Sequence, residues 1–401
     1  MVEVFTGSFT QQEPIPEEGI AAALSVLRHG RLHRYNTAPG EVAETVLLEE
    51  EFAAATGARY CLAVASGGYA MGTALRAAGV RPGDAVLTNA FTLAPVPGAI
   101  AGVGAVPVYV GVTEDLVIDL EDLAAKAGRA KVLLLSHMRG HLVDMAALMA
   151  LCDARGITVI EDCAHTMGAS WDGRPSGRWG RFGCFSTQTY KHVNSGEGGF
   201  LICDDAEDMA RAIMLSGSYM LYGTHRAGPP PEVFERIRYE TPNISGRMDN
   251  LRAAVLRPQV RDLQRQAARW NERYGVLAEG LSGTPGLRLP HRPEKEEFVA
   301  SSFQFLLLDW SDAAVAEVVS GCAARGVELK WFGGAEPKGF TSRYDSWRYA
   351  PAERMPASDR VLKAIVDMRL PLTFSLPDCA LIARIIRGEV GRVFQAQVAA
   401  E

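Results

Sequence analysis

The stretch ITVIEDCAHTMGA, residues 157–169, is a short apolar segment that ends in two carboxylates and continues to a histidine. Its length and its β-branched residues predict a buried strand. Similar segments recur on both sides of it, with helical stretches such as 145–156 between them. The expected strands cover residues 61–66, 85–90, 106–111, 131–137, 157–162 and 183–187. Continuous apolar strands joined by helices predict a parallel sheet covered on both faces, and so a three-layer α/β domain.

The pattern changes near residue 249. Residues 249–281 have apolar positions at helical spacing, interrupted by Pro258, where a kink or break is expected. Beyond this helix we expect strands at 301–310 and 327–332, helices at 312–326 and 380–394, and a long loop at 333–358. The chain is therefore predicted to form a large α/β domain over residues 1–255, followed by a bridging helix and a smaller α+β domain over 256–401.

Composition excludes several classes of protein. The 401 residues are 48% hydrophobic and 22% charged, with a formal net charge of -6, and the scattered Lys and Arg residues form no footprint for nucleic acid. No apolar run is long enough to span a bilayer and no signal peptide is recognisable, so we expect a cytoplasmic protein. The seven cysteines are widely spaced and are expected to be buried free thiols; no zinc spacing occurs, and no metal is expected.

Polar residues follow three of the expected strands, at the sheet edge where open α/β sheets bind ligands. Ser66-Gly67-Gly68 connects a strand directly to a helix, which suits a phosphate, although an ordinary strand-to-helix turn has the same pattern. Glu161 and Asp162 alternate along their strand, so only one of them can enter a site. That carboxylate could pair with the protonated ring nitrogen of an electron-sink cofactor. Nearby His165 fits either a site or the core.

The third group lies in residues 183–205, GCFSTQTYKHVNSGEGGFLICDD. Lys191 has apolar and aromatic neighbours on one side and the glycine-rich turn 195–199 on the other. Most lysines are solvated surface residues. A lysine removed from water has a lowered pKa and is the residue type that forms Schiff bases.

These motifs, taken together and in order, resemble the DegT/DnrJ/EryC1/StrS family of pyridoxal-phosphate (PLP) sugar aminotransferases, and the resemblance covers nearly the whole chain. The shared motifs are Ser66-Gly67-Gly68, Pro82-Gly83-Asp84 with Thr92, Gly104–Val108, Ile160–Ala169, Phe185–Lys191, Ser195–Gly199 and Arg247–Ala254. The resemblance implies the three-layer PLP-dependent transferase fold, known as fold type I. It also implies a homodimer in which each active site is completed by the neighbouring subunit.

Carried over residue by residue, the resemblance implies that Lys191 is the aldimine lysine and the general acid/base, and that Asp162 faces the pyridine nitrogen. His165 would contact the side of the ring that carries the hydroxyl. The phosphate would be held by Gly67, Gly68, the Tyr69 backbone and Ser186, and by Asn243 or Ser245 from the neighbouring subunit. Leu93 stands where the family places an aromatic residue over the ring, with Phe91 and Tyr69 nearby.

Several functions remain open from sequence. The first is amino transfer to a ketone acceptor, with glutamate or glutamine as the amino donor. A nucleotide-linked keto-sugar is the default acceptor, while residues 139–141, 218–220 and Leu93 depart from the family and suit a cyclitol or an aminobenzoate-like compound. The second is dehydration on the same scaffold, where relatives carry a histidine in place of the lysine; here His192 is one position away. The third is a non-catalytic PLP-binding regulator or partner subunit, against which Lys191 and Asp162 argue.

Overall fold

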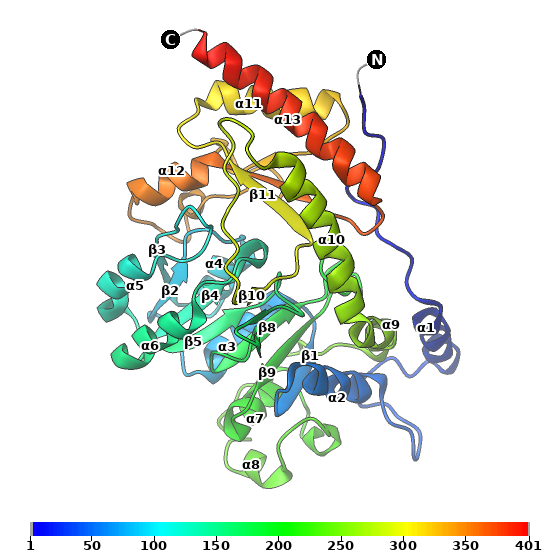
Figure 1. Cartoon of the computed structure of the whole chain (residues 1–401). Coiled ribbons are helices and arrows are strands. Elements are labelled where there is room, and N and C mark those ends of the chain that lie inside the picture. The colour runs from blue at the N-terminus through cyan, green and yellow to red at the C-terminus, as the bar shows by residue number, and fades with distance from the viewer. Residues whose placement is uncertain (1–2, 400–401) are drawn as a thin grey trace.

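The computed structural model describes residues 3–399, which form a large domain and a smaller one above it in the view of Figure 1. A seven-stranded sheet lies at the centre of the large domain, in the order β1-β9-β8-β5-β4-β2-β3. Its strands are β1 Tyr60–Val64, β2 Ala85–Asn89, β3 Val106–Val110, β4 Val132–Ser136, β5 Thr158–Asp162, β8 Phe182–Ser186 and β9 Gly199–Cys203. The sheet agrees with the strands expected from the sequence.

One strand departs from the expected parallel arrangement. β9 pairs antiparallel with both β1 and β8, whereas β8, β5, β4, β2 and β3 pair in parallel. The link between β8 and β9, residues 187–198, contains no helix. A parallel connection needs a crossover that is usually helical, so this short link returns the chain in the opposite direction.

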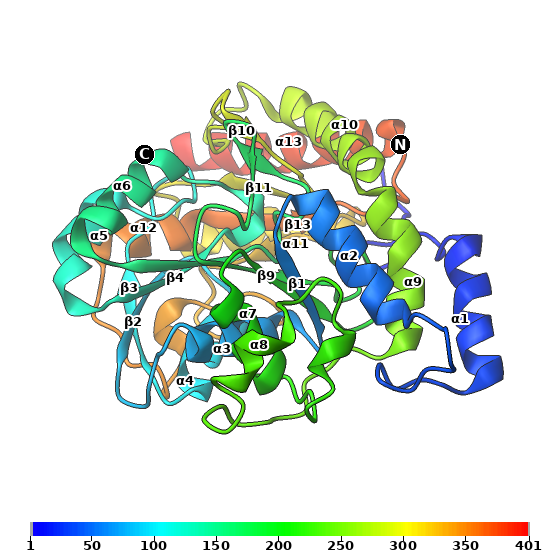
Figure 2. The same cartoon turned by 90° about the horizontal axis from the view of Figure 1, so that it is seen from below.

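Helices cover both faces of the sheet, as Figure 2 shows from below. One face packs on α3 Gly67–Ala77, α4 Pro95–Gly102, α7 Ala206–Leu215 and α8 Pro231–Glu235. The other packs on α2 Glu44–Thr56, α5 Leu120–Lys126, α6 Met145–Arg155, α9 Asn250–Arg261 and α10 Leu263–Leu281. Neighbouring residues of β5 pack against opposite helical layers, because Val159 and Ile160 belong to different core clusters. The three-layer prediction is confirmed.

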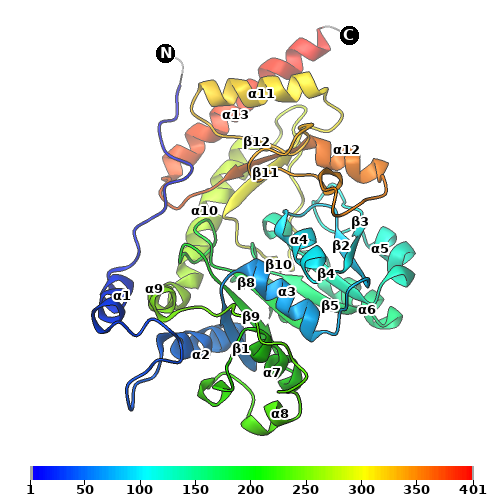
Figure 3. The ribbon, with the colours of Figure 1, turned by 180° about the vertical axis from the view of Figure 1, so that it is seen from behind.

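The small domain is built on an antiparallel sheet in the order β11-β13-β12, flanked by helices (Figure 3). Its elements are β11 Ser302–Leu306, α11 Asp312–Ala324, β12 Lys330–Trp331, α12 Pro356–Ala364, β13 Ile365–Arg369 and α13 Leu376–Val398. The sequence did not predict α12 or β13, and the long loop ends at Met355 rather than at 358. Phe5 and Phe9 from the N-terminal segment also pack into this domain's core. The division at residue 255 stays a prediction.

The bridging helix is interrupted close to the expected place. α9 continues through Pro258, and the break falls at Asp262, between α9 and α10. Shorter elements complete the chain. They are α1 Glu17–His29, β6 Ser170–Trp171, β7 Arg174–Pro175, β10 Glu296–Glu297 and the 3₁₀ turns Ala127–Arg129, Met138–Gly140, Tyr222–Thr224 and Tyr344–Ser346.

Two further expectations concern the described residues 3–399. All seven cysteines are buried and unpaired, as the sequence predicted. None of the helices in this range is both long and apolar enough to cross a bilayer.

Candidate functional site

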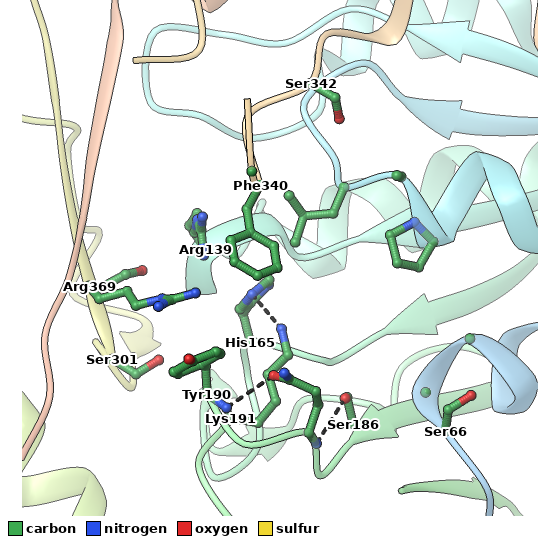
Figure 4. A pocket seen from close by; sticks show the side chains of 18 of the residues that line it. Ser66, Arg139, His165, Ser186, Tyr190, Lys191, Ser301, Phe340, Ser342 and Arg369 are labelled. Atoms are coloured by element: carbon green, nitrogen blue, oxygen red, sulfur yellow. Dashed lines mark hydrogen bonds between the residues drawn. The ribbon is translucent and has the colours of Figure 1, made fainter. Parts of the chain in front are cut away.

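A cavity of about 450 Å³ opens where β1, β5 and β8 end, beneath the small domain. This volume lies within the usual range for small-molecule sites. Its walls include residues from all three sequence motifs, among them Gly67, His165 and Lys191, together with residues from the small domain. Figure 4 shows Lys191 and His165 in the middle of the site, with Ser66 and Ser186 to one side and Arg139 and Arg369 to the other.

The Ser66 and Ser186 side of the cavity has the features of a phosphate site. Ser66 caps α3, since its side chain accepts a hydrogen bond from the Tyr69 N–H at 3.1 Å. The N–H groups at the start of a helix have no acceptor within that helix and attract anions. A Cβ on Gly67 would come within 2.9 Å of the Ser186 Cβ, so glycine allows β8 to approach the helix end this closely. Ser186 therefore lies beside the first turn of α3.

Lys191 is held in the β8–β9 link with its amine turned into the cavity. Its Nζ lies 2.7 Å from His165 Nε2. Burial, with help from the charge of Arg139, lowers the pKa of Lys191 to about 7. Burial and Lys191 also move the pKa of His165 well below its usual value. Near neutral pH a large share of the amine is uncharged, which is the form that reacts with a carbonyl group.

The link that carries Lys191 is fixed by its own glycine-rich turn. Thr187 and Ser195 form a side-chain hydrogen bond of 2.8 Å across the link, and the Thr187 N–H donates to the Gly198 carbonyl oxygen at 2.9 Å. Gly198 has a φ of 155°, and a Cβ there would come within 2.3 Å of Thr187 Oγ1. Glycine at this position is thus required for the tight return that places Lys191.

Asp162 and Glu161 point to opposite faces of the sheet, as their alternation predicts. Asp162 Oδ2 accepts from the Ser136 hydroxyl at 2.9 Å, and Oδ1 accepts from the Ala164 N–H at 3.2 Å. Burial raises the pKa of Asp162, so this carboxylate would gain strongly from a cationic partner. Asp162 does not line the cavity, but its charge favours the protonated form of Lys191.

Glu161, by contrast, stabilises the fold. Its carboxylate is fully buried and accepts from the N–H groups of Gly177, Trp179 and Gly180 at 2.7–2.9 Å. His137 Nε2 lies 3.0 Å from the same carboxylate. These contacts occupy both oxygens of Glu161 on the face of the sheet away from α3.

With one exception, the remaining candidates from the sequence lie apart from the cavity. The Tyr69 side chain turns away, and its hydroxyl donates to the carbonyl oxygens of Leu215 and Ile244. Phe91 is buried against Phe332. Leu93 does line the cavity. Asn243 and Ser245 are exposed on this chain and do not line it.

Several residues that form the cavity were not predicted from the sequence. Arg139 had been noted only as a departure from the family, and Tyr190, Phe340 and Arg369 were not considered for the site, yet all four line it. Phe340 belongs to the long loop 333–355 and Arg369 ends β13, a strand that was not predicted. The available signal for Arg369 was an arginine at the end of the mostly apolar segment 364–369.

Comparisons with known proteins agree on one family. The sequence profile of the "DegT/DnrJ/EryC1/StrS aminotransferase family" matches residues 15–386. The chain is 30% identical to a "Putative L-glutamine:3-amino-2,3-dideoxy-scyllo-inosose aminotransferase" of Micromonospora echinospora, over 70% of this chain and 66% of the relative, just under two thirds of that protein's length. It is 33% identical to the "3-amino-5-hydroxybenzoate synthase" of Amycolatopsis mediterranei (strain S699), over 60% of each chain.

A solved structure is also similar over nearly the whole chain. The crystal structure of 3-amino-5-hydroxybenzoic acid (AHBA) synthase superposes with a TM-score of 0.82 and 26% sequence identity, covering 98% of this chain and 100% of that one. The likeness extends to both domains and confirms the fold expected from the sequence.

Proposed function

Because this chain belongs to the DegT/DnrJ/EryC1/StrS aminotransferase family, we propose that it is a PLP-dependent aminotransferase. It moves an amino group from an α-amino acid, glutamate or glutamine, to a ketone. The donor leaves as its α-keto acid and the acceptor leaves as an amine, so atoms and electrons balance without a further oxidant. A keto-sugar, a cyclitol ketone or a related cyclic ketone is the acceptor class.

One observation carries this proposal. The Lys191 amine, with its pKa lowered to about 7, shares a cavity with a helix start suited to phosphate, and the charge of the buried Asp162 acts on it. These three groups match the reactive carbon, the phosphate and the ring nitrogen of PLP. Asp162 supports the match independently, because a buried carboxylate with a raised pKa would be stabilised by a protonated ring nitrogen.

Some of these residues would bind the cofactor, and others would hold or transfer protons. Gly67, Gly68 and Ser186 would hold the phosphate, and Asp162 would keep the ring nitrogen protonated. Lys191 Nζ would take and return a proton at the carbon that bears the amino group. When bound, PLP supplies an aldehyde that carries the amino group and a ring that accepts electron density.

The position of His192 favours amino transfer over dehydration. His192 is buried, and its ring packs edge-on against Trp270 with the centroids 5.2 Å apart. It does not line the cavity, whereas Lys191 does. The histidine that would suggest a dehydratase is therefore directed away from the site.

We also propose that the protein acts as a homodimer in the cytoplasm. The segments 219–221 and 243–245 are exposed on this chain and include the apolar side chains of Tyr219, Met220 and Ile244. A second copy that covers them would also bring its Asn243 or Ser245 to the neighbouring phosphate site. Seven unpaired cysteines suit a reducing compartment.

Lys191→Ala tests the proposal. Purified protein is incubated with PLP, and the visible absorbance that arises when the aldehyde condenses with an amine is recorded. We expect the wild type and Lys363→Ala, which changes an exposed lysine on α12, to give the same spectrum. Lys191→Ala should lack it, and glutamate or glutamine should bleach only the first two. An unchanged spectrum in Lys191→Ala would refute the assignment of this lysine.

A further inference from the structure

The cavity has a second polar end, to which the proposed function assigns no substrate group. Arg139 and Arg369 lie on the side of Lys191 away from Ser66 and Ser186, and both line the cavity together with Phe340 (Figure 4). The cavity therefore has one end suited to phosphate and one end with two fixed positive charges. The question is which part of a substrate the second end receives.

Arg139 is a buried cation with spare hydrogen-bonding capacity. It is 8% exposed, and its Nη2 lies 2.8 Å from Asp367 Oδ2. Its Nε and Nη2 nevertheless have no partner with hydrogen-bond geometry among the residues that the structure describes. Buried polar groups are nearly always hydrogen-bonded, and an exception calls for an explanation. Those two nitrogens are closed off from solvent, whereas Nη1 is not and makes no hydrogen bond to residues 3–399, so a ligand acceptor in the cavity would be bound through Nη1.

The backbone holds Arg139 in an unfavourable conformation to present it there. Arg139 has a φ of 57°, in the left-handed region that residues other than glycine seldom adopt. The adjoining Gly140 is equally constrained, because a Cβ there would come within 3.0 Å of the His165 carbonyl oxygen. Arg292 donates to the Gly140 carbonyl oxygen at 2.7 Å. Such strain persists only where the surroundings enforce it, and it is concentrated at functional sites.

Arg369 is arranged as a second donor to the same space. Its Cζ lies 3.6 Å from the centre of the Tyr190 ring and 4.9 Å from that of Phe340. Within residues 3–399 no carboxylate lies close enough to Arg369 to form an ion pair. The aromatic rings hold the guanidinium flat while leaving its N–H groups free for a ligand.

The charges at this end do not balance. Arg139, Arg369 and Lys330 approach one another, and the carboxylates near them are Asp367, which is buried, and Glu328, which is exposed. Asp367 is already bound by Gln304 at 2.7 Å. Glu197, the acidic residue among those that line the cavity, is exposed in the β8–β9 link. An anion at the Arg139 and Arg369 end would correct the excess of positive charge.

We propose that this end binds a carboxylate on the acceptor, so that the acceptor is a ring-shaped keto acid rather than a neutral cyclitol or sugar. This inference rests on the proposed function. A planar carboxylate matches the fork of donors on a guanidinium group, and the rings of Tyr190 and Phe340 provide flat apolar walls for a cyclic substrate. A neutral acceptor would leave Arg369 without a charged partner and Arg139 with only its contact to Asp367.

The first test measures binding and needs no turnover. The holoenzyme is titrated calorimetrically with 3-hydroxybenzoate and with 3-hydroxybenzamide, which have the same shape but differ in charge. We expect the wild type to bind the carboxylate at least about tenfold more tightly than the amide. In Arg369→Gln this preference should vanish, and Arg369→Lys should keep part of it. Arg387→Gln, which changes an exposed arginine on α13, should keep all of it.

The second test follows the acceptor half of the reaction. Enzyme bleached by glutamate is mixed with 3-oxocyclohexane-1-carboxylate or with its carboxamide, and the return of visible absorbance is recorded. The carboxylate should react at least about tenfold faster at low concentration, and this advantage should be lost in Arg369→Gln. Arg139→Gln is combined with Asp367→Asn, because Asp367 would otherwise be left buried without its partner.

Equal binding of acid and amide by the wild type, or failure to bind either, would overturn the proposal. A preference that survives in Arg369→Gln would also overturn it. If Arg369→Gln impairs only the bleaching by glutamate, these arginines serve the donor and the inference is wrong. Failure of the proposed function itself would be seen separately, as a wild type that gives no visible spectrum with PLP or is not bleached by any amino donor.

Discussion

At the scale of single residues, the adjacent carboxylates Glu161 and Asp162 have different roles because their surroundings differ. Glu161 is saturated with backbone hydrogen bonds and stays outside the cavity. Asp162 has two weaker contacts and faces the layer that contains α3 and the cavity. Strand alternation produces this separation, since neighbouring side chains leave the sheet on opposite faces. In the proposed function the chemistry depends on Asp162, and a change there should leave the fold intact.

Asp162→Asn should retain PLP but react slowly. The asparagine keeps the shape and can still accept from the Ser136 hydroxyl, but it has no charge to hold a proton on the ring nitrogen. We expect the rate of bleaching by glutamate to fall by two orders of magnitude or more, at roughly the size reported for lost electrostatic stabilisation in other enzymes. Stopped-flow absorbance measures this rate. Near wild-type bleaching, at equal PLP occupancy, would remove Asp162 from its assigned role.

At the scale of elements, the turn before β8 determines where the reactive groups lie. Residues 177–180 wrap around the Glu161 carboxylate, and β8 follows them with Ser186 at its end. The Lys191 link then starts from β8. A buried carboxylate in one strand thus sets the position of the next strand, and through it the positions of both Ser186 and Lys191.

Glu161→Gln should loosen this turn. The new amide group would point N–H donors at the backbone N–H groups that now donate to the carboxylate. We expect the free energy of unfolding to fall by about 3 kcal/mol, the usual scale for breaking a buried charged network. Urea denaturation measures the loss, and Glu121→Gln on the exposed face of α5 serves as control. Equal stability of the two variants would show that the turn does not depend on Glu161.

At the scale of the whole molecule, one buried ion pair joins segments that are distant in sequence. Glu49 on α2 accepts two hydrogen bonds of 2.9 Å from Arg34 and one of 2.8 Å from the Ala63 N–H of β1. His225 Nδ1 lies 3.6 Å from the same carboxylate. The N-terminal segment, α2, the edge strand β1 and the loop after α7 meet at this carboxylate.

The pH dependence of the free energy of unfolding should show how much Glu49 contributes to stability. The Arg34 and His225 contacts lower the pKa of Glu49 to about 2 despite its burial. A carboxylate with a lowered pKa in the folded state stabilises the protein above its unfolded pKa, near 4.5, and loses this contribution as pH falls toward 2. The lowered pKa corresponds to about 3 kcal/mol at pH 7.

Denaturation at pH 7 and pH 3.5 checks this expectation. Glu49→Gln should be less stable than the wild type at pH 7, and the difference should shrink at pH 3.5. Glu50→Gln, which removes a surface pair with Arg226, should change stability by less than about 1 kcal/mol at either pH. If Glu49→Gln and Glu50→Gln behave alike, the buried pair contributes no more than the surface one.

The sequence by itself determined the layered sheet and the three motifs at its edge, one of which contains Lys191, because apolar periodicity and glycine-rich turns act over short stretches of chain. It did not determine the direction of β9, the break at Asp262 or the turn of Tyr69 away from the cavity. Nor did it bring Arg139 and Arg369 together from opposite domains. Those features depend on how segments that are distant in sequence pack together. The direction of a side chain depends on such neighbours, and a local sequence pattern does not identify them. Tertiary structure alone therefore established the second, cationic end of the cavity.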